Sequence, residues 1–462
     1  MSRHILGLHQ QTQVLIQSSL PQQISPFERL PVEIKVEIFS RCIAPYSALD
    51  GTLILLCGIC LSWRTLIQST PKLWSNFGVD IPPLESDDLS KTVHVLEAMN
   101  TWLSRSKKCS LSIRLNHDPV GRIPDTRSAE MLAALIPHAD RWREIYLLIP
   151  NSSIAPLQDP LLLPETFRVL QSLTLDVRAC WTSFPPLDIR TLRIPWGRLT
   201  DLHLRLDSSP LTLDQCMDIL AKGANLVRCS LNVDCVVNIR GNRREKIPLL
   251  SMETFELVLL RDNQEVAEAP EICLVTFLEQ LEFGKLRKLG IDSLVQWNNT
   301  DVRLWHEIHS RFISLLGGLG ASLEALRIAY LPLSEAQILD SLMTLPKLVD
   351  LDLQFSMADR ERDPISNHFL YTLTLQFENS SRQSLHQLEN LRIACSGARL
   401  NTSVLLGFIH SRWTPSPVEK MNKKLKAFRF VSLRPVGYFV RQRMKIWGDE
   451  GLIIAIDGVD VR

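Results

Sequence analysis

The chain contains little glycine and almost no net charge. Only 19 of its 462 residues are glycine, and 51 Lys and Arg oppose 50 Asp and Glu, which leaves a formal net charge of +1. So few glycines argue against a fold that depends on glycine-rich phosphate loops. A balanced chain has no overall field to steer it onto nucleic acid, so no nucleic-acid partner is expected. With 45% hydrophobic residues the composition also excludes a mostly disordered protein.

Long hydrophobic runs are also missing. The longest apolar run, residues 51–61, is broken by Ser62 and Arg64 and falls short of the roughly 18 residues that a membrane span needs, so no membrane partner is expected. Residues 1–24 are rich in Gln and Ser, lack the apolar core of a secretory signal, and are interpreted as a flexible arm. The ten cysteines show no framework spacing, which is typical of reduced thiols in the cytoplasm or nucleus.

Leucine, by contrast, supplies 77 of the 462 residues. An apolar-x-x-apolar-x-apolar pattern begins at Leu170, Leu199, Leu226, Met252, Leu286, Leu323, Leu348, Leu388 and Leu425, with weaker versions at Leu111 and Ile145. From Ile145 its second apolar position recurs after 28, 29, 27 and 26 residues, and then after 34, 37, 25, 40 and 37. The early spacing matches the leucine-rich repeat, whose period is about 20–29 residues. Helical stretches lie between the copies, so each unit is predicted to be a strand followed by a helix.

Such units must stack, because one strand and one helix cannot bury an apolar face alone. We therefore predict an α/β fold with a small helical module over residues 25–75, a linker helix within 76–106, and a repeat domain over 107–462 whose parallel sheet lines a concave side. Side chains alternate along a strand, so the leucines should point into the core and the residues between them onto the concave surface.

These concave positions are the candidate contacts for a protein substrate. They include His203, Arg205, Glu256, Arg327, Asp352, Arg392 and Arg429. Their mixed charge suits a protein partner better than a membrane or a nucleic-acid backbone, although an ordinary solvated strand face is the alternative. Residues 401–462 carry eleven basic and five acidic residues, Lys420 among them. That basic end is either a solvated face or a patch for an acidic partner.

The sequence offers no catalytic or metal-binding arrangement. Cys57 and Cys60 have C-x-x-C spacing but stand alone inside an expected apolar helix, which predicts buried packing. His306 and His309 are three residues apart, one fewer than H-E-x-x-H requires, which predicts a surface or boundary helix. The glycines of 317–320 follow a helix and precede a strand, as a helix C-cap and turn would. Neither enzymatic activity nor a cofactor or metal is expected.

Three motifs in residues 26–74 carry a family resemblance. They are Leu30-Pro31-Val32-Glu33-Ile34-Lys35-Val36-Glu37-Ile38-Phe39, Cys60-Leu61-Ser62-Trp63-Arg64 and Pro71-Lys72-Leu73-Trp74. In this order and spacing they resemble an F-box. Thr101–Ser106 and Ile136–Arg143 resemble the segments that follow the F-box in many fungal, basidiomycete-type F-box proteins with C-terminal leucine-rich repeats.

The resemblance implies a substrate-recognition subunit of a cullin–RING ubiquitin ligase. In that family the F-box binds a Skp-type adaptor, and the repeats hold the protein substrate. Leu30, Pro31, Ile34, Ile38 and Phe39 would contact the adaptor or shape its surface, and Cys60, Trp63 and Leu66 would pack the module and complete the interface. Two alternatives remain open. The first is a leucine-rich-repeat interaction scaffold whose F-box-like segment is only a structural cap. The second is a hydrolase or transferase within the repeats, although the sequence contains no motif that supports it.

Overall fold

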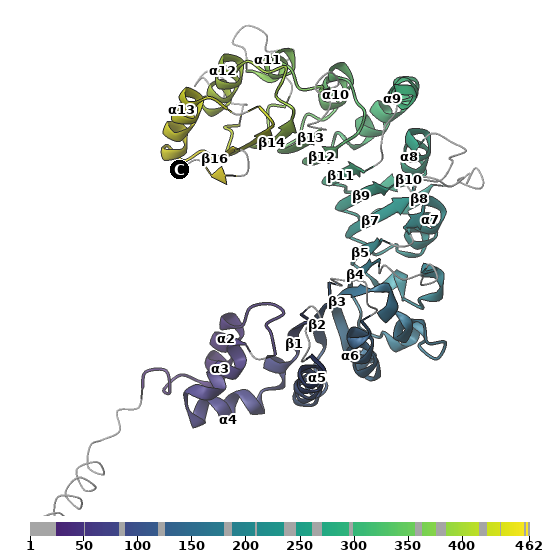
Figure 1. Ribbon diagram of the computed structural model, residues 1–462, viewed down its shortest axis with the longest axis vertical. Coiled ribbons are helices and arrows are strands. Elements are labelled where there is room, and N and C mark those ends of the chain that lie inside the picture. Colours follow the sequence, from purple (N-terminus) through teal and green to yellow (C-terminus); the bar gives the residue numbers. More distant parts are fainter. Residues whose placement is uncertain are drawn as a thin grey trace, which may run out of the picture. The chain divides into compact units, whose positions relative to one another are not determined.

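The computed structural model describes residues 25–49, 51–82, 88–118, 125–179, 187–207, 210–234, 246–260, 270–294, 299–355, 363–375, 385–414, 423–434, 436–456 and 459–460. These residues fall into two compact units. The first holds the described residues up to Val79 together with Val93–Ser112, and the second holds Asp80–Thr92 and everything from Ile113 onward. The chain combines α-helices with one large, mostly parallel sheet, which confirms the α/β class (Figure 1).

The first unit is mainly helical. Its elements are α2 (Val32–Cys42), α3 (Thr52–Ile59), α4 (Leu61–Ser69), the 3-10 helix η1 (Pro71–Trp74), β1 (Asn76–Asp80) up to Val79, and α5 (Asp88–Arg105) from Val93 onward. Helix α2 starts directly after Pro31, as expected, because the fixed φ of proline suits the start of a helix. The helix expected as a linker therefore belongs largely to this unit.

Aromatic rings hold the first unit together in two groups. Phe39 is buried and packs on Trp63 at 5.0 Å between ring centroids, while Phe27 lies 4.7 Å from the same indole. In the second group Trp74 meets Trp102 edge-on at 4.9 Å. The indole nitrogen of Trp74 donates to a backbone carbonyl of α4 at 2.8 Å, so the polar atom of this buried ring is satisfied.

The expectation of one apolar helix containing both Cys57 and Cys60 was wrong. Cys60 interrupts it with φ −155° and ψ 167°, so that α3 ends at Ile59 and α4 starts at Leu61. The Cys60 carbonyl accepts the first hydrogen bond of α4, from the amide of Arg64, as the residue before a helix does. The unbroken run of apolar residues across this junction concealed the break.

The second unit is organised around the large sheet. Its strands are β2 (Leu111–Asn116, from Ile113), β3 (Trp142–Pro150), β4 (Ser172–Arg178), β5 (Asp201–Leu206), β6 (Leu211–Thr212), β7 (Arg228–Asp234), β9 (Thr254–Leu260), β11 (Lys288–Ser293), β12 (Ala325–Ala329), β13 (Asp350–Gln354), β14 (Asn390–Cys395), β15 (Ala427–Ser432), β16 (Ile453–Ile456) and β17 (Val459–Asp460). They follow one another in chain order, with β6 paired on β7 to the side, and the pairs from β3 to β16 are parallel. A separate parallel pair joins β8 (Ile247–Leu249) to β10 (Leu281–Phe283).

Every copy of the leucine pattern forms a strand, and the copies from Ile145 onward are aligned in register. The second apolar positions form one continuous row: Ile145, Leu173, Leu202, Cys229, Phe255, Leu289, Leu326, Leu351, Leu391, Phe428 and Ile454. All of these residues are buried. The expectation that the leucines of the pattern point into the core is therefore confirmed.

Helices cover one face of this sheet, as Figure 1 shows for α7 to α13. The helices are α6 (Arg127–Leu135), α7 (Leu213–Lys222), α8 (Pro270–Glu279), α9 (Asn299–Leu319), α10 (Glu335–Met343), α11 (Asn367–Leu373), α12 (Thr402–Trp413) and α13 (Tyr438–Asp449). The 3-10 helices are η2 (Ile136–Arg141), η3 (Asn151–Ser153), η4 (Ala155–Gln158), η5 (Pro164–Thr166), η6 (Ile189–Thr191) and η7 (Trp196–Arg198).

The rule of one strand followed by one helix fails early in the sheet. In the connections from β3 to β4 and from β4 to β5, the described residues form short 3-10 helices and no α-helix. Prolines explain this, because Pro156 and Pro164 lie in η4 and η5, and Pro195 directly precedes η7. A proline has no amide hydrogen for an α-helix interior, so these connections stay short and irregular.

Near the C-terminal end, the buried Arg412 on α12 donates hydrogen bonds to two backbone carbonyls outside its own helix. The Arg412 side chain is 1% exposed and donates from Nε and Nη2 to the carbonyl of Leu373, at the end of α11, and from Nη1 to the carbonyl of Leu385. Burial lowers the pKa of Arg412 to about 10. The guanidinium thus supplies donors to backbone carbonyls that would otherwise be buried without partners.

Candidate functional site

Helices α2, α3 and α4 of the first unit leave large apolar side chains in solvent. They are Val32 and Ile34 on α2, Ile54, Leu55 and Ile59 on α3, and Leu61 at the start of α4. We call these six residues the apolar set. Leu61 is 75% exposed and Leu55 is 70% exposed. Single exposed apolar residues are ordinary, whereas large exposed apolar patches mark interaction sites, so these six residues are the candidates for contact with a partner.

The eight residues expected to bind an adaptor are spread between this surface and the core beneath it. Pro31 and Ile34 are exposed, whereas Phe39 is buried. Leu30, Ile38, Cys60, Trp63 and Leu66 are partly exposed. Phe39 was expected either to contact the adaptor or to shape its surface. Because its ring is buried and packs on Trp63, only the second role fits.

Sequence reasoning missed Ile54, Leu55, Ile59 and Leu61 as surface residues. They lie in an almost wholly apolar stretch, so no polar neighbour marked which side faces water. Phe27 was also missed, although its ring completes the group with Phe39 and Trp63.

Cys60 lies at the break between α3 and α4 rather than buried inside one helix, so that expectation was wrong. Its sulfur lies 3.2 Å from the Ser62 hydroxyl. The hydrogen bond from Ser62 and the backbone amide of Trp63 lower the pKa of the Cys60 thiol. Cys57, one helical turn earlier, is buried, and burial raises its thiol pKa.

The second surface is the helix-free face of the sheet. The residues between the second and third apolar positions form one register row: Thr174, His203, Ser230, Glu256, Gly290, Arg327, Asp352, Arg392, Arg429 and Ala455. We call this the polar row. Six of the seven expected substrate contacts therefore lie in the polar row. The seventh, Arg205, lies two residues beyond it on β5 and pairs in register with Asp176.

The middle of the polar row is neutralised by the chain itself. Arg327 donates to both carboxylate oxygens of Asp292, at 2.7 and 2.8 Å, and also pairs with Asp352. These contacts, first of all the hydrogen bond to Asp292, raise the pKa of Arg327. A guanidinium held by two carboxylates has little charge left to offer a partner.

The C-terminal end of the row differs. Arg392 and Arg429 are register neighbours and both are exposed. Arg392 lies 3.9 Å from Asp352, which already pairs with Arg327, and Arg429 has no ion pair within the described part of the chain. Two adjacent guanidiniums with one shared carboxylate leave net positive charge at this end of the face.

A shallow pocket of about 390 Å³ opens at the other end of the row. Thr174, His203, Ser230 and Glu256 line it, with flanking residues that include Lys288. Lys288 pairs with Glu256 at 2.7 Å. Burial lowers the pKa of His203 despite the nearby carboxylates, so this imidazole acts as a neutral hydrogen-bonding group at pH 7. The pocket is close to charge-neutral, because Asp201 and Glu256 in its lining balance Arg228 and Lys288.

Part of the concave surface expected from strand alternation is covered. The side chains two residues beyond the polar row on β4, β7 and β13 are each less than 9% exposed; they are Asp176, Asn232 and Gln354. Ala329 and Ala394, at the equivalent positions of β12 and β14, are also buried. The accessible face is therefore narrower than alternation alone predicts.

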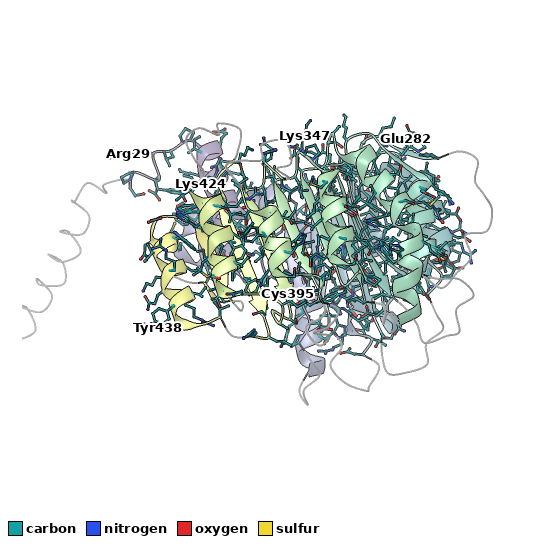
Figure 2. All side chains as sticks on the ribbon, turned by 90° about the horizontal axis from the view of Figure 1, so that it is seen from above. Arg29, Glu282, Lys347, Cys395, Lys424 and Tyr438 are labelled. Atoms are coloured by element: carbon teal, nitrogen blue, oxygen red, sulfur yellow. The ribbon has the colours of Figure 1, made fainter. Side chains whose placement is uncertain are left out.

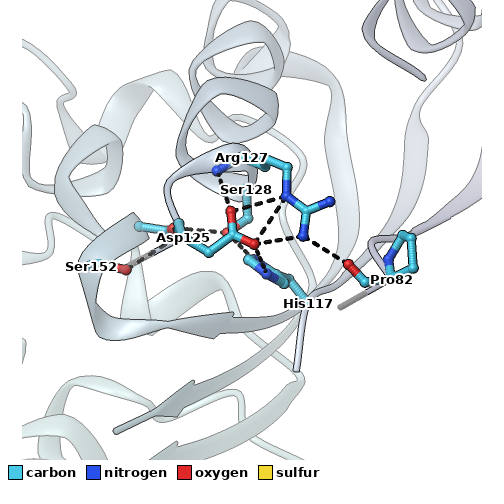
Figure 3. Close-up of polar contacts among 7 residues, drawn as sticks. Pro82, His117, Asp125, Arg127, Ser128 and Ser152 are labelled. Carbon is cyan, nitrogen blue, oxygen red and sulfur yellow. Dashed lines mark hydrogen bonds and ion pairs between the residues drawn. The ribbon is translucent and has the colours of Figure 1, made fainter. Parts of the chain in front are cut away.

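A buried network of His117, Asp125 and Ser128 resembles a catalytic triad at first sight (Figure 3). The imidazole lies 2.8 Å from the Ser128 hydroxyl and 3.0 Å from the Asp125 carboxylate. Arg127 also binds that carboxylate through several hydrogen bonds and reaches the Pro82 carbonyl at 2.8 Å. Ser128 has no exposed surface, so no substrate carbonyl can reach its oxygen. The network joins the end of β2 to the start of α6.

The histidine pair and the glycine cluster singled out in the sequence lie in or next to helix α9. His306 and His309 lie on α9, where His306 is exposed and His309 is buried 4.0 Å from Asp340. Gly317 and Gly318 lie inside α9, so of the expected turn glycines only Gly320 follows its end. Among the described residues no group of three His, Cys, Asp or Glu side chains is placed to hold a metal.

Part of the charge at the basic C-terminal end is engaged by the chain itself. Lys423 and Lys426 both pair with Glu389, and Lys424 lies over the Trp413 ring at 3.1 Å from its centroid. Lys420 lies outside the described residues. Figure 2 places Lys424 on the edge of the second unit opposite Tyr438.

Neither a scan against protein-family models nor a search of curated proteins found a match. No helix in the described part of the chain is both long and apolar enough to span a membrane.

Proposed function

We propose that the chain is the substrate-recognition subunit of a cullin–RING ubiquitin ligase. In this proposal the first unit is an F-box that binds a Skp-type adaptor, and the second is a leucine-rich-repeat solenoid that holds a protein substrate. The observation that carries the proposal is the apolar set, because it lies in the same segment as the three F-box-like motifs.

The energetics favour a partner on that surface. Covering a leucine side chain contributes about 1.5–3 kcal/mol, and Leu55 and Leu61 are the two most exposed members of the apolar set. The core beneath is well packed, since Phe39, Leu53 and Ile67 are each at most 1% exposed. A preformed apolar surface loses little conformational entropy on binding, which favours affinity.

The register of the second unit supports the repeat assignment. Its parallel strands carry one apolar row toward the helices and one polar row on the opposite face. A solenoid of this kind offers an extended surface to a protein partner. No residue of the chain performs covalent chemistry in this proposal, because holding substrate and adaptor together raises the effective concentration of a substrate lysine near the transfer machinery.

Adaptor capture tests the proposal. The full chain and a Leu55→Ala/Leu61→Ala variant would each be titrated with a purified Skp-type adaptor. We expect the wild type to bind and the variant to lose about tenfold or more in affinity, with an unchanged melting temperature because both side chains are exposed.

Leu161→Ala is the matched control. Leu161 is 84% exposed but lies in the second unit, so its loss should leave adaptor binding unchanged. If the wild type captures no adaptor, the ligase proposal fails and the interaction scaffold with a helical cap takes its place. If all three proteins bind equally, the apolar set is not the docking surface.

A further inference from the structure

The C-terminal part of the second unit contains a pocket whose charge is of one sign. It has a volume of about 520 Å³ and opens where β14 and β15 end and α12 and α13 begin. Arg399 and Arg434 are among its lining residues, and no Asp or Glu lines it. The pocket on the polar row differs, since its cations stand beside Glu256 and Asp201. A concave site with two guanidiniums and no acid is suited to an anion.

The loop that carries Arg399 is held in place from behind. The Asp363 carboxylate accepts from the Ser396 hydroxyl at 2.6 Å and from the Gly397 amide at 3.2 Å, and the Asp363 carbonyl accepts from Arg399 at 2.9 Å. Glu335 lies 3.9 Å from the same guanidinium but is itself bound by Ser366 at 2.6 Å. These acids fix the loop without entering the pocket.

Arg434 is the less restrained of the two cations. It is exposed and makes no ion pair within the described residues. The Ser432 hydroxyl donates to the backbone carbonyl of Arg434 at 2.6 Å, which fixes the main chain while leaving the guanidinium to reach a ligand. Gly397, at φ +71°, lies so close to this segment that an added Cβ would stand 3.0 Å from Ser432. The two arginine-bearing loops are therefore packed against each other.

The backbone adds to the positive potential of the pocket. Neither α12 nor α13 has an acidic residue in its first turn. Gly437 precedes α13 without a side-chain cap, so the first amides of that helix are not bound by a capping side chain. Helix starts carry partial positive charge, which reinforces the two guanidiniums.

Exposed aromatic rings stand beside the pocket. Tyr438 and Phe439 directly follow the lining residue Gly437 and are 71% and 86% exposed, with their ring centroids 6.1 Å apart. Figure 2 shows Tyr438 and Cys395, at the end of β14, along one edge of the second unit, with Lys347 along the opposite edge. Rings of this size next to an anion pocket favour a protein segment over a small ion, because they offer contact to a neighbouring apolar side chain.

We propose that this pocket binds an oxyanion, carboxylate or phosphate, carried by a segment of a protein partner. Arg399 and Arg434 hold the anion, and Tyr438 and Phe439 contact the residue beside it. The inference rests on the proposed function, for which it names the substrate class: a protein with an acidic or phosphorylated residue next to an apolar one.

The test uses the full chain and three degenerate peptide libraries, each with a fixed central Asp, phosphoserine or Asn. Fluorescence anisotropy should show the Asp or the phosphoserine library bound at least about tenfold more tightly than the Asn library, with the preference falling as salt rises. Whichever of the two binds more tightly identifies carboxylate or phosphate as the source of the anion.

Arg434→Gln should abolish this preference. Lys347→Gln, an equal loss of charge on the opposite edge, should leave it intact. Equal binding of the charged and Asn libraries, or an Arg434→Gln variant that keeps the preference, would overturn the inference. Adaptor capture by Arg434→Gln should match the wild type because Arg434 lies in the other unit. Failure of this inference therefore differs from failure of the ligase proposal.

Discussion

Two glycines three residues apart should respond in opposite directions to the same added methyl group. Gly317 lies inside α9, and a Cβ built there meets no atom within 4 Å. Gly320 follows the end of α9, where a Cβ would overlap the backbone carbonyl oxygen of Thr344. Thr344 is the C-terminal cap of α10, and its amide is bonded to carbonyls of that helix, so the Thr344 carbonyl has little freedom to move away.

The expected magnitudes follow from these surroundings. Gly317→Ala should stabilise the protein by about 0.5–1 kcal/mol, because alanine loses less backbone entropy in a helix and meets no clash. Gly320→Ala should destabilise it by about 1–3 kcal/mol, the usual range for forcing an extra group into a packed site. The two variants should therefore differ by about 1.5–4 kcal/mol, although they have the same composition.

Thermal and urea unfolding of the full chain, followed by circular dichroism, measures the difference. The melting temperature should rise for Gly317→Ala and fall for Gly320→Ala, by about 2 °C per kcal/mol for a unit of this size. Gly318→Ala is a second control, since its added Cβ also meets nothing within 4 Å. A neutral or stabilising Gly320→Ala would refute the packing of α9 against the end of α10.

Three further predictions concern buried and titrating groups. Arg412→Met should destabilise the protein by about 3 kcal/mol in urea unfolding, because it leaves two buried carbonyls without donors; a change below about 1 kcal/mol would contradict the assigned role. Burial lowers the pKa of His117, so its contribution to the free energy of unfolding is present above about pH 6.5 and lost as pH falls toward the folded pKa. His117→Asn should flatten that pH dependence between pH 5 and 7.5, and an unchanged profile would be evidence against it. At pH 7.5 Cys60 should react with iodoacetamide before Cys57, because its thiol pKa is lowered and that of Cys57 is raised; peptide mass mapping of the reverse order would contradict the assigned environments.

The sheet could be predicted from the sequence because its signal is local and repeated. Each leucine pattern spans one strand, and a shift by one residue would turn the apolar side chains to the wrong face. Once Leu202 and Leu351 face the helices, His203 and Asp352 must lie on the opposite face. That is why most of the expected substrate contacts share the polar row.

The parts that were not predicted depend on contacts between segments distant in sequence. The break at Cys60 lies in a continuous apolar run, and the burial of Asp176 comes from neighbours that strand alternation does not describe. The pocket at Arg399 and Arg434 was missed for the same reason. Its cations lie on two loops 35 positions apart, which only the packing of β14 on β15 brings together. No spacing rule links such a pair.

Ion pairs within the sheet also limit where a charged partner can bind. A partner that used Arg327 would have to displace Asp292 or Asp352, and breaking a half-buried pair costs more than an exposed contact returns. Arg429 carries no such cost, since no carboxylate among the described residues pairs with it. Recognition of an acidic segment is therefore expected at the C-terminal strands, where the polar row ends in free positive charge and the arginine pocket opens. The middle of the sheet, although richer in charged residues, is already satisfied by its own pairs.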